Sequence, residues 1–70
     1  MGADLFAWEA ERTAEQAVAL AHARQEEARR RAAWPPHGLK KVREDALRQA
    51  TAEALKAEAA LSALRTEARP

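Results

Sequence analysis

The chain has 70 residues and no cysteine, and its 12 basic and 11 acidic side chains leave a net charge of +1. A core of this size supplies about 3 to 5 kcal/mol, and without cysteine neither disulfides nor thiolate metal sites can reinforce it. Aromatic residues make up only 4% of the chain, and much of its 47% hydrophobic content is alanine, the best helix former but a poor core filler, so the composition favours long, closely packed helices and a partner chain as the source of extra stability.

The first predicted helix covers about residues 4–33. No proline or glycine lies between Asp4 and Ala33, and the short side chain of Asp4 suits a helix N-terminus. Alanines recur along this segment at steps of three and four, which is typical of a helix face that packs on another helix. The predicted inter-arm seam of this helix consists of Ala7, Ala10, Ala14, Ala17, Ala21 and Ala28.

A turn is predicted at residues 34–38. Pro35 and Pro36 end the first helix, because proline lacks an amide donor and disfavours helical backbone at the preceding residue. Gly38 gives the chain freedom to turn. We expect Trp34 to fold back over the end of the hairpin as a hydrophobic plug. A connection this short makes the two helices antiparallel neighbours.

The second predicted helix covers about residues 39–68. Its seam consists of Leu47, Ala50, Ala54, Ala57, Leu61 and Leu64. Both seams follow a seven-residue repeat, so the helices should cross at a shallow angle, as in a coiled coil. The predicted fold is all-α: one antiparallel two-helix hairpin over residues 1–70, with a coiled-coil-like, alanine-rich seam.

Several apolar residues of the sequence lie outside the predicted seam. A two-helix hairpin covers one stripe on each helix, and the remaining apolar positions need another surface. These candidate partner contacts are Phe6, Trp8, Val18, Leu20, Trp34, Leu39, Val42 and Leu55. We expect them to be covered either by a second hairpin, giving a dimeric four-helix bundle, or by a larger assembly.

Charge is unevenly distributed along the chain. Residues 24–48 hold eight basic and four acidic side chains, a net +4, and the rest holds four basic and seven acidic, a net −3. A hairpin therefore has an acidic open end and a basic tip, formed by Arg29, Arg30, Arg31, Lys40, Lys41 and Arg43. The arginines suit a helix C-terminus. The two lysines fall in a first turn, where the dipole disfavours them, so even paired with Glu44 and Asp45 they indicate an acidic partner.

The stretch PHGLKKVREDALRQAT, residues 36–51, resembles the start of the second helix in the small two-helix protein of the bacterial large ribosomal subunit. The shared features are a Pro-His turn, the Leu-Lys-Lys-Val-Arg-x-Asp run and a later arginine. The resemblance implies an RNA-bound hairpin, with matching positions at Lys40, Lys41, Arg43 and Arg48. It covers 16 of 70 residues, and the first helix lacks that family's pattern.

Residues that carry catalysis are sparse. Ser62 is the only serine, tyrosine and cysteine are absent, and neither His22 nor His37 has a nucleophile and an orienting acid at suitable spacing. No apolar run approaches the ~20 residues of a membrane span, and the N-terminus lacks the pattern of a signal peptide. We expect no enzyme activity, no metal, no cofactor, and a soluble protein of the cytoplasm or an organelle matrix.

The predicted function is a non-catalytic protein-protein interaction module: an accessory or adaptor subunit that docks on a larger complex or self-associates. The alternative is an RNA-binding hairpin that acts through its basic turn, with Trp34 stacking on a base. The sequence pI of about 8.3 is low for a dedicated nucleic-acid binder.

Overall fold

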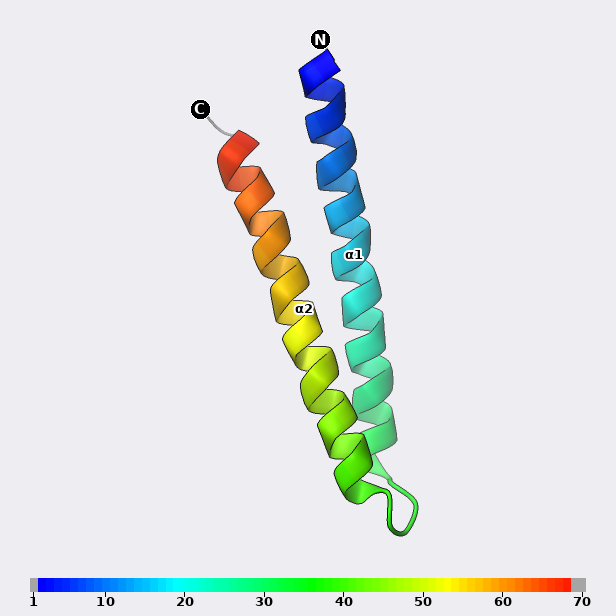
Figure 1. The fold of residues 1–70 in the computed structure, drawn as a ribbon. Coiled ribbons are helices and arrows are strands. Elements are labelled where there is room, and N and C mark those ends of the chain that lie inside the picture. The colour runs from blue at the N-terminus through cyan, green and yellow to red at the C-terminus, as the bar shows by residue number, and fades with distance from the viewer. Residues whose placement is uncertain (1, 69–70) are drawn as a thin grey trace.

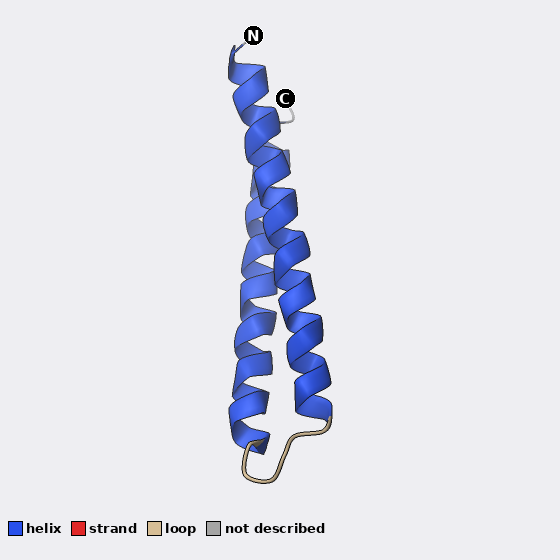
Figure 2. Cartoon of the chain, turned by 90° about the vertical axis from the view of Figure 1, so that its right-hand side faces the viewer, coloured by secondary structure: helices blue, strands red, loops and turns tan. Residues whose placement is uncertain are grey.

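A computed structural model describes residues 2–68. This part of the chain is all-helical and contains two helices, α1 (Gly2–Ala33) and α2 (Lys40–Ala68). The helices lie antiparallel and side by side, with the connection at one end of the hairpin and both termini at the other (Figure 1). The views in Figures 1 and 2 together show that they cross at a shallow angle. The Cα atoms extend over 57 × 15 × 12 Å, so the molecule is a thin rod. The prediction of an all-α, two-helix chain is confirmed.

The helix boundaries lie close to those expected from the sequence. α1 begins at Gly2, so Asp4 lies inside its first turn rather than preceding it. α1 ends at Ala33, directly before the Trp-Pro-Pro stretch. α2 begins at Lys40, because the Leu39 carbonyl accepts the Arg43 amide over 3.0 Å and thereby starts the helical hydrogen-bond pattern.

The connection between the helices contains a tight turn. The Leu39 N–H donates to the Pro36 carbonyl over 3.0 Å. Gly38 has φ of +86°, and among the described residues no residue other than glycine has a positive φ. A positive φ at the third of four residues defines a type II turn, in which that position favours glycine. Gly38 is therefore the residue that lets the chain reverse within a few positions.

Arg43 fastens the connection to α1. Its Nη1 donates to the carbonyl oxygen of Arg31 over 3.0 Å. The last carbonyls of a helix have no partner within the helix, so a donor from the second helix satisfies one of them. Arg43, which the sequence placed in the basic tip, thus also links the C-terminal turn of α1 to the first turn of α2.

The seam side of α2 follows the seven-residue repeat. Ala54 and Leu61 are buried, with 2% and 8% of their surface exposed, and they are the only buried hydrophobic residues among those described. The other predicted seam positions of α2 are half-buried: Leu47, Ala50, Ala57 and Leu64. Alanine at half of the six seam positions of α2 lets the helices approach closely but leaves less apolar surface to bury.

The seam side of α1 differs from the predicted stripe. Ala14, Ala21 and Ala28 are half-buried, whereas Ala10 and Ala17 are exposed. The half-buried line beside the first three is instead Glu11, Val18, Gln25 and Ala32. In a seven-residue repeat, two lines of residues flank the line of Ala14, Ala21 and Ala28, and either can complete the seam. The line of Val18 does so instead of the line of Ala17, which corresponds to a rotation of α1 about its own axis by about 50° from the predicted orientation. It buries part of a valine, which contributes more than an alanine does.

Ala7 is also exposed, although it lies on the same line as Ala14. The reason is the length of α2. Arg65 contacts Glu11, and α2 ends at Ala68, less than one turn further. Ala7 lies one turn beyond Glu11, at the level where α2 ends, so little of the second helix is left to cover it.

Candidate functional site

Hydrogen bonds between side chains join the helices along one side of the hairpin. Arg65 donates from Nε to Glu11 Oε1 over 3.0 Å and from Nη2 to Glu15 Oε1 over 3.1 Å. These bonds, the one to Glu11 first, raise the pKa of the Arg65 guanidinium above its ordinary value. His22 likewise contacts Glu58. We call this side the bridged flank, and it consists of Glu15, His22, Thr51, Glu58 and Arg65.

The seven-residue repeat explains why these residues meet. Glu15 and His22 are seven positions apart on α1, and Thr51, Glu58 and Arg65 follow the same interval on α2. Between antiparallel helices, the two lines lie on one side of the seam and face each other. Thr51 also accepts a hydrogen bond from the seam residue Gln25 over 3.2 Å. The side chains in the contacts of His22 and Arg65 with glutamates are about half exposed, so these contacts fix the register of the helices more than they stabilise them.

The other side of the seam combines exposed apolar side chains with charged ones. Near the tip it forms an open groove, whose lining includes Arg24, Glu27, Ala28, Arg31, Val42 and Ala46. Ala17 and Leu20 lie seven residues before Arg24 and Glu27, and Glu53 and Ala60 lie seven and fourteen residues after Ala46, so all four continue this face along the rod. We call this side the apolar flank after its apolar members, Ala17, Leu20, Val42, Ala46 and Ala60. Within residues 5–67, no hydrogen bond between side chains of the two helices crosses it.

Most of the predicted partner contacts are exposed. These are Phe6, Trp8, Leu20, Trp34, Leu39, Val42 and Leu55. The structure places Val18 differently: it is half-buried, because it belongs to the seam line of α1. Leu5 is also exposed, at 56%, and the sequence analysis did not single it out. The sequence offered a signal for this exposure: Leu5 comes directly before Phe6, and two consecutive residues of a helix do not both face the seam.

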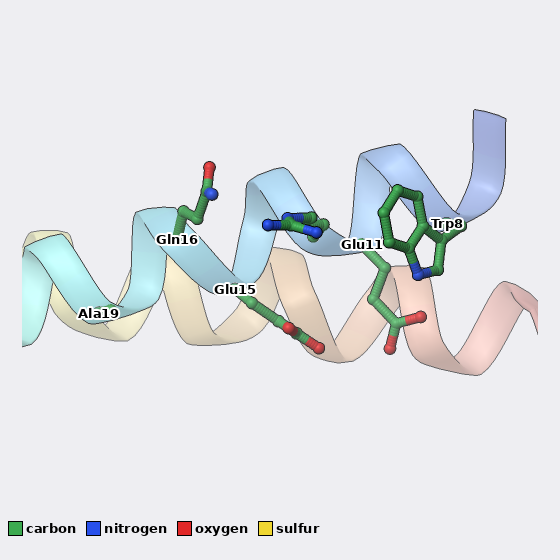
Figure 3. Close-up of a pocket in the computed structure, with 6 residues that line it drawn as sticks. Trp8, Glu11, Glu15, Gln16 and Ala19 are labelled. Atoms are coloured by element: carbon green, nitrogen blue, oxygen red, sulfur yellow. The ribbon is translucent and has the colours of Figure 1, made fainter. Parts of the chain in front are cut away.

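Trp8 lies at the open end of the rod, beside an open hollow on α1. The Arg12 guanidinium carbon lies 5.3 Å from the centroid of the Trp8 ring, within range of a cation-π interaction. Figure 3 shows Glu11 and Glu15 pointing to one side of α1 and Gln16 to the other. Since Arg65 already contacts both glutamates, the charged groups of this hollow are matched within the protein. Nothing in its chemistry calls for a ligand.

The basic tip is partly neutralised by neighbours on the same helix. Arg29 lies 3.4 Å from Glu26 and Arg31 lies 3.2 Å from Glu27. Behind the tip, Arg48 lies 3.7 Å from Asp45. Arg43 is directed at the end of α1, as described above.

The remaining cations of the tip make no ion pair among the described residues. These are Arg30, Lys40 and Lys41, and the expected pairs of the lysines with Glu44 and Asp45 are not formed. All three side chains are exposed. The tip therefore presents uncompensated positive charge on both sides of the turn.

Trp34 does not fold back over the hairpin, contrary to the expectation. It is 89% exposed, whereas the next residue, Pro35, is half-buried. The chain bends at Trp34, directly after α1 ends at Ala33. The indole of Trp34 therefore faces solvent, and it follows the basic last turn of α1 in the sequence.

The described residues contain no group of three or more His, Asp or Glu side chains placed to hold a metal ion. Neither helix, over its described length, is long and apolar enough to cross a membrane. Comparisons with protein-family models, with curated proteins and with solved structures gave no significant match. No family match therefore accompanies the resemblance of residues 36–51 to the ribosomal hairpin.

Proposed function

We propose that this chain is a non-catalytic protein-protein interaction module: a small accessory or adaptor subunit that docks on a larger complex or self-associates into a helical bundle. One observation carries the proposal. Among the described residues only Ala54 and Leu61 are buried, whereas large apolar side chains such as Leu20, Val42 and Leu55 are more than half exposed. A chain that places its larger hydrophobic residues outside its own seam has them available for another surface.

The exposed area supports the same proposal. The chain exposes 5834 Å², whereas a compact folded monomer of 7.7 kDa exposes about 4,300 Å². The excess is about 1,500 Å². An isolated hairpin of this shape buries little apolar surface. The free energy gained by that burial only slightly exceeds the conformational entropy cost of ordering the chain, so the net stability is small.

The parts of the hairpin have separate roles in this function. The seam around Ala54 and Leu61 holds the helices together, and the bridged flank fixes their register. The apolar flank is the surface offered to a partner. The basic tip and the acidic open end orient the rod during association, because complementary charge steers encounter and selects the docking direction.

The proposal is tested by thermal unfolding of the isolated chain, followed by circular dichroism from dilute to concentrated solution, with a fluorescent hydrophobic dye added in parallel. We expect the dilute chain to be weakly stable and to bind the dye, since its apolar flank is uncovered. A dilute chain that is fully helical, melts at high temperature and binds no dye would contradict the proposal, because it would need no partner.

A pair of variants assigns the dye signal to the apolar flank. Leu20→Gln combined with Val42→Gln removes the two largest side chains of that flank and should reduce dye binding strongly. The matched control is Ala52→Gln, at an exposed alanine that lies outside both flanks. The control should leave dye binding unchanged, because its site contributes little apolar surface.

A second candidate function is RNA binding at the basic tip. It is supported by Trp34, which is 89% exposed and lies between the cations that end α1 and those that begin α2. Exposed aromatic rings stack on bases, and neighbouring lysines and arginines contact phosphates. This candidate places the function at the turn rather than on the apolar flank.

A titration with single-stranded RNA at two salt concentrations distinguishes the two candidates. RNA binding at the tip should weaken steeply with salt and be lost in Lys40→Glu combined with Lys41→Glu. Trp34→Ala should weaken it with less change in salt dependence. Lys56→Glu, an exposed lysine far from the tip, is the control. Binding that is unaffected by the tip variants, or absent at low salt, would remove this candidate.

A further inference from the structure

We propose that the apolar flank is covered by a second copy of this chain, docked with its rod antiparallel to the first, so that two hairpins form a four-helix bundle. The inference rests on the proposed function and names its partner. Three observations carry it: the size of the flank, the distribution of charge along the rod, and the placement of the larger side chains on the flank.

The face of the rod that carries the flank has about the size of a standard interface. A face of the rod measures 57 by 15 Å, a projected area of about 850 Å². Stable interfaces bury about 800 Å² on each partner. A second hairpin of the same length therefore covers the whole face, and no larger surface is required to reach the area of a standard interface.

Charge selects the antiparallel arrangement. Residues 24–48, which form the tip half, carry a net +4, and the rest of the chain carries −3. On the flank itself, Arg31 is paired with Glu27, whereas Arg24 lines the groove near the tip without an ion pair among the described residues. Glu67 lies seven residues after Ala60 and so occupies the same face at the open end. Antiparallel rods bring opposite charges together, whereas parallel rods place both basic tips side by side.

The side chains of the flank are complementary under the same two-fold arrangement. Ala17 and Ala60 lie in the middle section of the rod, where small residues let helices of two copies approach closely. Val42, 62% exposed, lies near the tip, and Phe6, 71% exposed, lies fourteen residues before Leu20 on the same line at the open end. An antiparallel partner sets α1 along α1 and α2 along α2 of the other copy, so the tip with Val42 lies at the open end with Phe6, and the two side chains meet on the diagonal of the bundle. Such an isologous interface uses one surface twice and closes on itself.

Single cysteines test both the face and the direction, because the chain has none of its own. Ala17→Cys places a thiol on the apolar flank near the middle of α1, and Ala46→Cys places one on the same flank near the tip. Ala19→Cys is the matched control: it is exposed, lies two residues from Ala17, and points away from the flank. Each variant is oxidised with diamide and its cross-linked fraction is measured, alongside the mass of the unmodified chain by light scattering.

We expect the unmodified chain to have twice the mass of 7.7 kDa and Ala17→Cys to cross-link far more than Ala19→Cys or Ala46→Cys. Only near the two-fold axis do equivalent residues of antiparallel copies come within disulfide reach. Cross-linking of Ala46→Cys in preference to Ala17→Cys would overturn the inference in favour of parallel rods. Equal cross-linking of Ala17→Cys and Ala19→Cys would overturn the choice of face.

A monomeric mass at every concentration would also overturn the inference, and it separates that failure from failure of the proposed function. A monomer that binds the hydrophobic dye still offers its apolar flank to a different protein, so the proposed function stands and the second copy does not. A monomer that is stable and binds no dye would remove both.

Discussion

The two flanks of the hairpin differ although the same two helices form them. On the bridged flank, polar side chains reach across from one helix to the other, as Arg65 does to Glu11 and Glu15. On the apolar flank, within residues 5–67, no hydrogen bond joins side chains of the two helices, and Leu20 and Val42 are more than half exposed. The polar side chains of the bridged flank bond to one another, whereas the large apolar side chains of the apolar flank are exposed to solvent.

The difference shows that separate residues set the alignment of the two helices and supply the free energy of association. Exposed ion pairs contribute little to the free energy of folding, but wrong pairings are disfavoured, so the bridged flank specifies how the helices align. Apolar surface supplies most of the free energy of association. Because Leu20 and Val42 stay more than half exposed, the chain keeps part of its hydrophobic free energy for a partner.

The largest expected effect comes from the seam that separates the flanks. Leu61→Ala should lower the free energy of unfolding by about 2 to 5 kcal/mol, because it empties a site that is 92% covered. The matched control is Leu55→Ala on the same helix, where the leucine is 61% exposed. Chemical denaturation of both variants measures the difference. Equal losses would mean that the seam does not hold the hairpin together.

Ala54→Leu should give the next largest effect. Ala54 is 2% exposed, so a larger side chain forces the helices apart and destabilises the hairpin by about 1 to 3 kcal/mol. The same change at Ala46, an exposed residue of the apolar flank, should leave unfolding of the dilute chain unchanged and strengthen its association. Thermal unfolding and sedimentation of both variants sharpen the contrast between seam and flank. A stabilised Ala54→Leu variant would place the seam elsewhere.

Gly38→Ala tests the turn that aligns the flanks. A Cβ at Gly38 meets no atom within 4 Å, so any loss comes from the backbone, whose φ is +86°. The left-handed region costs a residue with a Cβ about 1 to 2 kcal/mol. Gly38→Asn should lose less, since asparagine tolerates that region better. Melting temperatures of the three chains check the order, and an unchanged Gly38→Ala variant would show that the turn adopts another conformation in solution.

Arg65→Gln on the bridged flank should have the smallest effect. It removes the hydrogen bonds to Glu11 and Glu15, but these side chains are exposed and their interactions are screened by salt. We expect a slightly lower melting temperature, and a difference from the unmodified chain that shrinks at high salt. Lys56→Gln, which removes an exposed charge from the same helix, is the control. A loss as large as that of Leu61→Ala would reverse the roles assigned to flank and seam.

Much of the fold follows from the sequence. Pro35, Pro36 and Gly38 locate the turn, because each restricts or frees the backbone by itself, without any contact from elsewhere in the chain. The seven-residue repeat of α2 is unambiguous, since Leu47, Leu61 and Leu64 share a face with the small residues between them. Local backbone preferences and a clear apolar line are thus enough to predict two antiparallel helices.

The rotation of α1 and the position of Trp34 could not be predicted with the same rules. Alanine lies on several lines of α1, so the pattern alone does not say whether Ala17 or Val18 faces α2. The choice depends on contacts from the second helix, including the hydrogen bond of Gln25 with Thr51. For Trp34, the expectation considered only its apolar ring, whereas its direction depends on how the chain bends between Ala33 and Pro35.

The measurement that tests the central claim most directly is the mass of the unmodified chain by sedimentation equilibrium, from dilute to concentrated solution, beside Leu20→Lys combined with Val42→Lys. The account predicts that the unmodified chain approaches twice 7.7 kDa as its concentration rises. The double variant should stay at the monomer mass, because it places charge on the apolar flank. A chain that remains monomeric throughout, or a double variant that associates equally well, would contradict the claim that this flank is an interface between two copies.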